Sequence, residues 1–144
     1  MLILTRKIGQ KINLDGGISI APLKIQGNLL IEGNAEVIIK GNVFVTGNIM
    51  IKNNARFELT PSFGSSGTVI IAEGKIDIAG NAIVNGTESG GFLLIMSSKS
   101  NGSDAITLQA NFQSQTTVFY ALSGGLTIGA NAHVIGAYGK QVVL

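Results

Sequence analysis

The residues of this chain that could carry out acid–base chemistry are its carboxylates. They are Asp15, Glu32, Glu36, Glu58, Glu73, Asp77, Glu88 and Asp104. Cleavage of a polysaccharide needs two carboxylates, or a carboxylate and an arginine, close together on one face. Here Glu32 and Glu36 each have a basic residue 20 positions further along, and no acidic pair recurs. The pattern favours solvated surface charge over catalysis.

The single histidine and the loop serines give no stronger sign of chemistry. His133 is predicted to be an exposed residue on a strand, and no spacing in the chain supplies it with further metal ligands. The serine pairs at 65–66 and 97–98 have no nucleophile elbow and no base nearby in the sequence. We therefore expect no enzyme activity, no metal site and no cofactor.

A repeated sequence motif is expected to position these side chains. It reads LLIEGNAEV at residues 29–37 and returns at 49–57, 76–84 and 126–134, with a degraded copy at 106–112. Each copy alternates apolar and variable residues, which is the period of a β-strand. Self-similarity at about 20 residues indicates a solenoid. We predict an all-β fold, a single right-handed parallel β-helix of about four to five coils, with the hand that the crossover rule favours.

Recurring asparagines and glycines are predicted to be structural. The asparagines are Asn34, Asn54, Asn81, Asn111 and Asn131, and the glycines seven residues before them are Gly27, Gly47, Gly74 and Gly124. We expect an internal ladder, in which each amide bonds to the next coil or to the backbone of its own turn. Ligand binding by these amides is the alternative. The glycines predict a turn that needs positive φ or a close approach of two backbone segments.

The charges give a test of the register. A shift of 20 residues places Glu32 beside Lys52 and Glu36 beside Arg56. Stacked coils bring equivalent residues within about 4.8 Å, so opposite charges would be neighbours. Exposed pairs of this kind contribute only tenths of a kcal/mol, yet both agree with the 20-residue register.

The whole chain is expected to be one domain. Residues 1–22 read as N-terminal strands that cap the first coil, and residues 23–144 read as the β-helix itself. Two insertions lengthen the repeat: residues 60–67, and a second one that combines Gly90 and Gly91 with residues 97–104. The apolar run at 92–96 between those flanks predicts a strand that is covered on both sides.

Composition sets few further limits. The chain has 144 residues, 45% of them hydrophobic and 12% charged, with a net charge of +2 and no cysteine. This excludes disulfides and thiolate metal sites, and it gives no basic patch for nucleic acid. No signal peptide or membrane span is visible. We expect a cell-surface location if the chain is part of a longer exported protein, and a cytoplasmic one if it is full length.

Several stretches resemble the short β-helical domain of PilX-like bacterial pilus assembly proteins. They are residues 40–49, residues 92–98, and the ending with Phe119-Tyr120-Ala121, Leu126-Thr127-Ile128 and Val134-Ile135-Gly136-Ala137. The match covers roughly residues 12–144, without the N-terminal membrane-anchoring helix of such proteins. The resemblance implies a non-catalytic, extracellular role in pilus or surface-appendage assembly, with other protein subunits or further copies of the chain as partners.

Two other resemblances give alternatives. Bactofilins, the polymer-forming bacterial cytoskeletal proteins, are also short β-helices with Gly-Asn turns, which implies a self-polymerising scaffold. The start, residues 1–9, together with residues 23–28, is similar to the carbon storage regulator, an RNA-binding protein. That family has a second RNA-binding arginine in a later strand, whereas the next arginine after Arg6 here is Arg56. We therefore expect no nucleic-acid partner.

The third functional alternative is carbohydrate binding or cleavage. Phe119, Tyr120 and Tyr138 could line a platform for a glycan, although aromatic residues of a β-helix more often fill its core or cap its ends.

Overall fold

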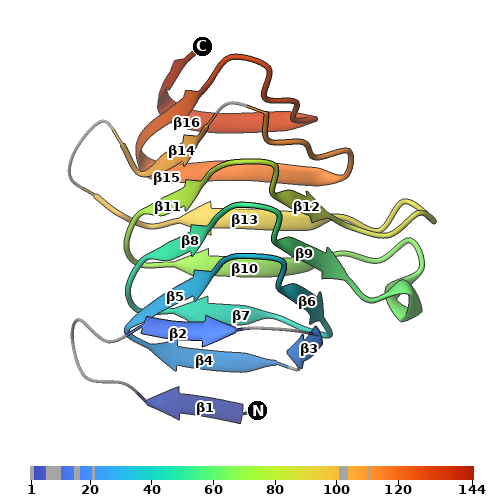
Figure 1. The fold of residues 1–144 in the computed structure, drawn as a ribbon. Coiled ribbons are helices and arrows are strands. Elements are labelled where there is room, and N and C mark those ends of the chain that lie inside the picture. Colours follow the sequence, from blue (N-terminus) through green and yellow to red (C-terminus); the bar gives the residue numbers. More distant parts are fainter. Residues whose placement is uncertain (1, 6–10, 15–16, 21, 101–103, 110) are drawn as a thin grey trace.

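The chain folds as a parallel β-solenoid (Figure 1). The computed structural model describes the backbone of residues 2–5, 11–14 and 17–20, and all atoms of residues 22–100, 104–109 and 111–144. Within these residues the only helical element is the short 3₁₀ segment η1, Pro61–Phe63. None of the described segments forms an apolar helix long enough to cross a membrane. The predicted all-β parallel β-helix is confirmed.

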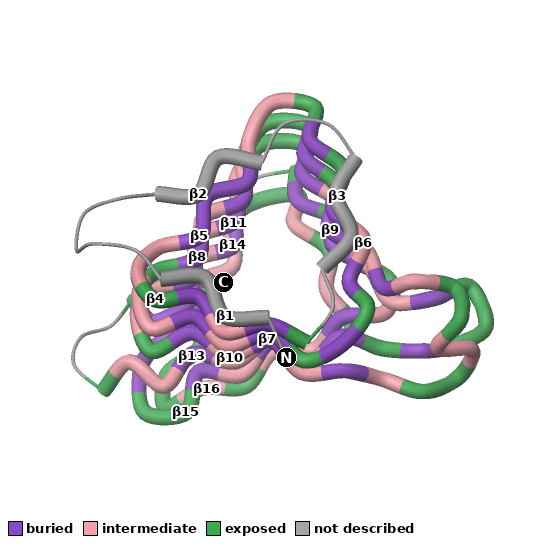
Figure 2. The backbone as a smooth tube through the Cα atoms, turned by 90° about the horizontal axis from the view of Figure 1, so that it is seen from below, coloured by how far each residue is buried: buried purple, intermediate pink, exposed green. Residues whose placement is uncertain are grey.

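Three walls enclose the core (Figure 2). Wall 1 contains β1 (Leu2–Thr5), β4 (Leu23–Gln26), β7 (Val43–Val45), β10 (Thr68–Ala72) and β13 (Leu93–Ser97). Wall 2 contains β2 (Lys11–Leu14), β5 (Asn28–Ile31), β8 (Ile49–Ile51), β11 (Ile76–Ile78) and β14 (Ile106–Leu108). Wall 3 contains β3 (Gly17–Ile20), β6 (Glu36–Ile39), β9 (Arg56–Leu59) and β12 (Ile83–Asn85). Seen from the N-terminal end, the chain turns clockwise as it recedes, so the solenoid is right-handed.

The last two strands each serve two walls. β15 (Thr117–Ile128) pairs with β13 along wall 1 and then with β14 along wall 2. β16 (Gly136–Val143) follows β15 along both walls, with a register shift at the corner between Ala121 and Gly125. Because these strands turn the corner, walls 1 and 2 are joined into one 12-stranded sheet within the described residues.

The N-terminal segment continues the same walls. β1, β2 and β3 pair in parallel with β4, β5 and β6, one strand on each wall. Residues 1–22 thus contribute strands with the same pairing as the later coils. That they also cap the solenoid stays a prediction.

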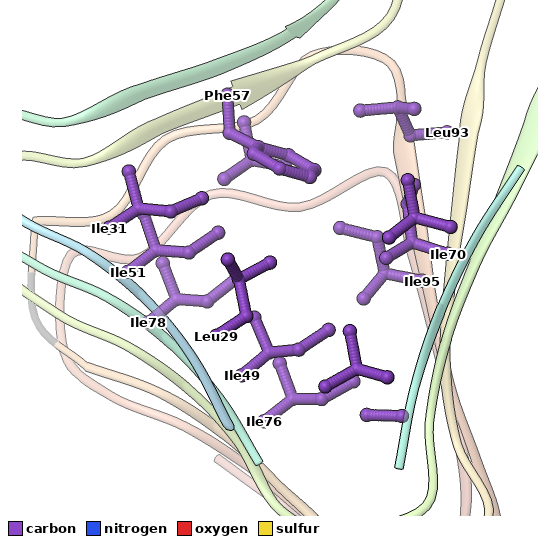
Figure 3. Close-up of a cluster of buried hydrophobic side chains, with 14 of the residues drawn as sticks. Leu29, Ile31, Ile49, Ile51, Phe57, Ile70, Ile76, Ile78, Leu93 and Ile95 are labelled. Atoms are coloured by element: carbon purple, nitrogen blue, oxygen red, sulfur yellow. The ribbon is translucent and has the colours of Figure 1, made fainter. Parts of the chain in front are cut away.

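Alternation within the strands fills the core. In wall 2 the inward residues stack as Leu29–Ile49–Ile76 and Ile31–Ile51–Ile78, all fully buried (Figure 3). Phe57 of wall 3 and Ile70, Leu93 and Ile95 of wall 1 close the space opposite. Burial of this apolar surface supplies most of the stability, at about 25 cal/mol per Å² removed from water.

The insertions leave the solenoid at two different corners. Residues 60–67 and 86–92 project side by side from the corner between walls 3 and 1 (Figure 1, Figure 2). Residues 98–105 join β13 to β14 at the corner between walls 1 and 2, and 101–103 lie outside the described part. The grouping of Gly90 and Gly91 with residues 97–104 is therefore wrong, since β13 separates the two segments.

Candidate functional site

The candidate catalytic residues lie on different walls and loops, and only some of them come together. Glu36, Arg56 and Glu58 face outward on wall 3, whereas Asp77 lies on wall 2 and Glu88 in a lateral loop. In the part of the chain that the structure describes, no three metal-binding side chains come together. Arg6 and Asp15 lie outside the described residues. Among the described residues, one groove brings two carboxylates, Glu58 and Glu88, together with Arg56.

One charged contact does form on wall 3. The Arg56 guanidinium donates from Nε and Nη2 to the two carboxylate oxygens of Glu58, at 3.2 and 3.1 Å. This contact, and to a smaller extent the charge of Glu36, raises the pKa of Arg56 above its ordinary value. Glu36 pairs in register with Arg56, as predicted, but the ion pair runs along the strand rather than between coils.

The predicted environment is found for His133 but not for Ser97. His133 is exposed and forms an isolated parallel β-bridge with Gln113. Gln113 forms a second such bridge with Ile83, the residue of β12 that pairs with Arg56. Ser97, a candidate loop serine, is instead buried at the end of β13. Its hydroxyl donates to the carbonyl oxygen of Gly74 at 2.8 Å, so its role is structural.

The asparagine ladder exists, but it lies on the outside. Asn54 Nδ2 donates to Asn34 Oδ1 at 3.2 Å, and Asn81 Nδ2 donates to Asn54 Oδ1 at 3.4 Å. All three side chains are exposed, so the prediction of an internal ladder is wrong in its location. The reason is the neighbouring Ala35, which points inward and is fully buried, and thereby turns the asparagine toward solvent.

Positive φ changes position along the turns that carry this ladder. In the earlier coils Gly33, Asn53 and Gly80 have φ of 73°, 62° and 74°, one residue before the key asparagine. In the last two coils the key residues themselves, Asn111 and Asn131, have φ of 67° and 61°. Alanine at position 130 cannot take a left-handed φ without strain, so the asparagine takes it.

A second ladder, which the sequence analysis missed, holds the corner between walls 1 and 2. Asn48 N donates to Asn28 Oδ1 at 2.8 Å, and Lys75 N donates to Asn48 Oδ1 at 2.7 Å. The recurring pairs Gly-Asn, Gly-Asn and Gly-Lys at this corner are the sequence feature that could have predicted the second ladder. Each side chain thus satisfies a backbone donor of the next coil.

The predicted glycine turn explains the same corner. Gly27 has a φ of 110°, and a Cβ atom at Gly47 would lie 2.5 Å from the Gly27 carbonyl oxygen. A Cβ atom at Gly74 would lie 2.7 Å from the carbonyl oxygen of Gly47. Positive φ at the first glycine and close approach at the next two confirm the prediction. Gly124 differs, because it lies inside β15 and its φ is not positive.

The two lateral loops form a rigid ridge. Thr87 Oγ1 accepts a hydrogen bond from Gly91 N at 2.8 Å and donates to the carbonyl oxygen of Gly64 in the other loop. Thr87 is buried, so these contacts lock the loops together. A groove of about 320 Å³ lies between the ridge and wall 3, and its lining includes the Arg56–Glu58 pair of wall 3 and Glu88 of the ridge.

The outer surface of wall 1 is largely apolar. Its middle row runs Lys24, Phe44, Ile71, Met96, Tyr120 and Tyr138, residues that pair one with the next across successive strands. A second row runs Val69, Leu94 and Val118. Apart from Lys24, whose Nζ lies 5.6 Å from the centre of the Phe44 ring, these side chains are apolar or aromatic. We call this surface the apolar wall.

Polar side chains cover much of the other two walls. The equivalent middle row of wall 2 runs Leu30, Met50, Asp77, Thr107 and Thr127, so it is apolar in the first coils and polar from Asp77 onward. Wall 3 carries the charged and amide side chains described above, together with the outward Ile38 and Ile83. The run at 92–96 was predicted to be covered on both sides. That is wrong within this chain, since Leu94 and Met96 are partly exposed on the apolar wall and Phe92, beside it, is 46% exposed.

The candidate aromatic platform is divided between core and surface. Phe119 is fully buried against Phe112, edge to face at 5.6 Å, so it cannot contact a glycan. Tyr120 and Tyr138 lie outside, with ring centres 6.4 Å apart, beside an open depression of about 500 Å³ that also includes Lys140. This depression is the part of the surface that could hold a sugar.

Comparison with known proteins assigns no family. No family model, no curated protein and no solved structure matches the chain.

Proposed function

We propose that the chain is a non-catalytic structural domain of a bacterial pilus or surface-appendage assembly, acting through protein contacts at the cell surface. The observation that carries the proposal is the apolar wall. Interfaces between proteins have apolar, aromatic and methionine-rich centres with polar rims. Glu73 and Ser98 lie along one edge of the wall and supply such a rim.

Rigidity of the scaffold supports the same role. The core is continuous through the coils, and backbone hydrogen bonds and asparagine side chains join one coil to the next. Such a body keeps the side chains of its wall in fixed positions, which lowers the entropy cost of binding a partner. The resemblance to PilX-like domains points the same way.

Deletion and complementation in the encoding bacterium test this proposal. We expect deletion to reduce the number of surface appendages counted by electron microscopy, and the wild-type gene to restore it. A gene carrying Met96→Lys, which places a charge on the apolar wall, should fail to restore it. The control Thr107→Lys changes a partly exposed, outward residue of wall 2 in the same coil and should restore it. Unchanged appendages after deletion would overturn the proposal.

A second candidate is a self-polymerising scaffold, favoured by the surface of the last coil. Within the described residues β16 pairs only with β15, so its other edge has no strand partner. Val142 is paired with the buried Leu126 and yet is 41% exposed. If coils stack end to end, filaments will be visible by electron microscopy, and Val142→Lys will abolish them while Met96→Lys will not. Absence of filaments at high concentration would exclude this candidate.

A further inference from the structure

The apolar wall presents its side chains in regular rows. The pairing from β4 to β13 and into β15 proceeds without a register shift, so each row continues from strand to strand. All-parallel sheets are normally covered on both faces, and a contiguous apolar face commonly marks a site of protein interaction. The outer layer that this wall lacks is therefore the feature to be explained.

Shape decides between the possible covers. A helix is a cylinder about 10–12 Å across and would cover one stripe of the surface, leaving the neighbouring rows exposed. A second sheet covers all rows at once, with the two sheets about 10 Å apart. This chain itself carries such a sheet. We propose that the apolar wall packs face to face on the apolar wall of a second copy, an inference that rests on the proposed function and names the partner of that surface.

The side chains select one orientation of the two copies. A two-fold axis parallel to the solenoid axis would place Lys24 against Lys24 of the second copy, so like charges would meet. It would also turn Val69 toward the second copy's Glu73, which would remove a carboxylate from water without a partner. A two-fold axis parallel to the strands reverses the order of the coils instead. It places Lys24 against Tyr138, a favourable cation–aromatic pair, and Ile71 against Met96. The second arrangement is the one we infer.

The size of the wall sets the strength of the contact. Five strand spacings from Lys24 to Tyr138 give a length of about 24 Å, and four residue steps give a width of about 13 Å. The footprint of about 300 Å² per copy is well below the roughly 800 Å² per partner of a stable complex. The dimer should therefore be weak and dependent on concentration. Within an assembly, many such weak contacts would together give a stable association.

Sedimentation of the purified chain over a wide concentration range tests the dimer. We expect a reversible monomer–dimer equilibrium for the wild type and for Thr107→Lys. Met96→Lys should weaken the association at least tenfold while its circular dichroism and melting stay like those of the control. A wild type that remains monomeric at the highest concentration, or a Met96→Lys variant that associates like the control, would overturn the inference.

A charge exchange tests the orientation. Ile71→Lys and Met96→Glu should each dimerise less than the wild type, and an equimolar mixture of the two should associate more than either alone, because these positions face each other. No gain on mixing would refute the coil-reversed packing. If the chain is monomeric but Met96→Lys still abolishes appendages in cells, the second copy is wrong as the partner and the proposed function stands.

Discussion

The corner ladder makes a quantitative prediction at Asn48. Its Oδ1 atom accepts the backbone hydrogen of Lys75 at 2.7 Å, and Lys75 belongs to the next coil. Asn48→Ala removes the acceptor and leaves that backbone donor without a protein partner. A net hydrogen bond contributes about 0.5–1.5 kcal/mol. Because Asn48 is exposed, water replaces part of the bond, and we expect a loss of about 1 kcal/mol in the free energy of unfolding.

Asn48→Asp is the matched control, since aspartate keeps an acceptor oxygen at the same position. Unfolding in guanidinium chloride, followed by circular dichroism, measures both variants against the wild type. For a chain of this length a loss of 1 kcal/mol also lowers the melting temperature by about 2–4 °C. The aspartate variant should retain most of the stability. Equal losses in the two variants, or no loss in either, would refute the claim that the acceptor oxygen stabilises the corner.

Three further substitutions test other parts of the fold. Asn54→Leu removes two exposed side-chain hydrogen bonds and should cost less than about 1 kcal/mol; an unchanged melting temperature would refute a stabilising outer ladder. Phe57→Ala empties a fully buried site and should cost about 3–5 kcal/mol by chemical unfolding, whereas a loss below 1 kcal/mol would contradict its place in the core. Thr87→Val removes the hydroxyl that joins the two lateral loops and should speed hydrogen exchange at the Gly91 amide by mass spectrometry; unchanged exchange would show that this hydroxyl does not hold the ridge.

The sequence predicted the part of the fold that depends on periodicity. Alternation in the repeats placed Ile49, Ile76 and their equivalents inside, and the 20-residue step placed Glu36 beside Arg56. Both follow from parallel stacking, in which equivalent residues of successive coils become neighbours. The glycines at the first corner were predictable for the same reason, because close approach recurs in every coil that stacks there.

What could not be predicted depends on contacts between distant residues. The sequence does not say which residue of the turn takes the positive φ, since that depends on the residue beside it, as Asn53 and Asn131 show. It does not show that Thr87 reaches Gly64. The apolar wall was hidden as well. Met96 and Tyr120 stand in apolar runs that read as core, and only the strand direction reveals that they face outward.

Site-specific photo-crosslinking in the encoding bacterium tests the central claim most directly. A photoreactive amino acid would replace Met96 on the apolar wall or, as the control, Thr107 on wall 2. The account predicts crosslinked products of defined mass from position 96, a dimer of the chain among them, and few or none from position 107. Crosslinking that is equal at the two positions, or absent from position 96 in cells that build their appendages, would contradict it.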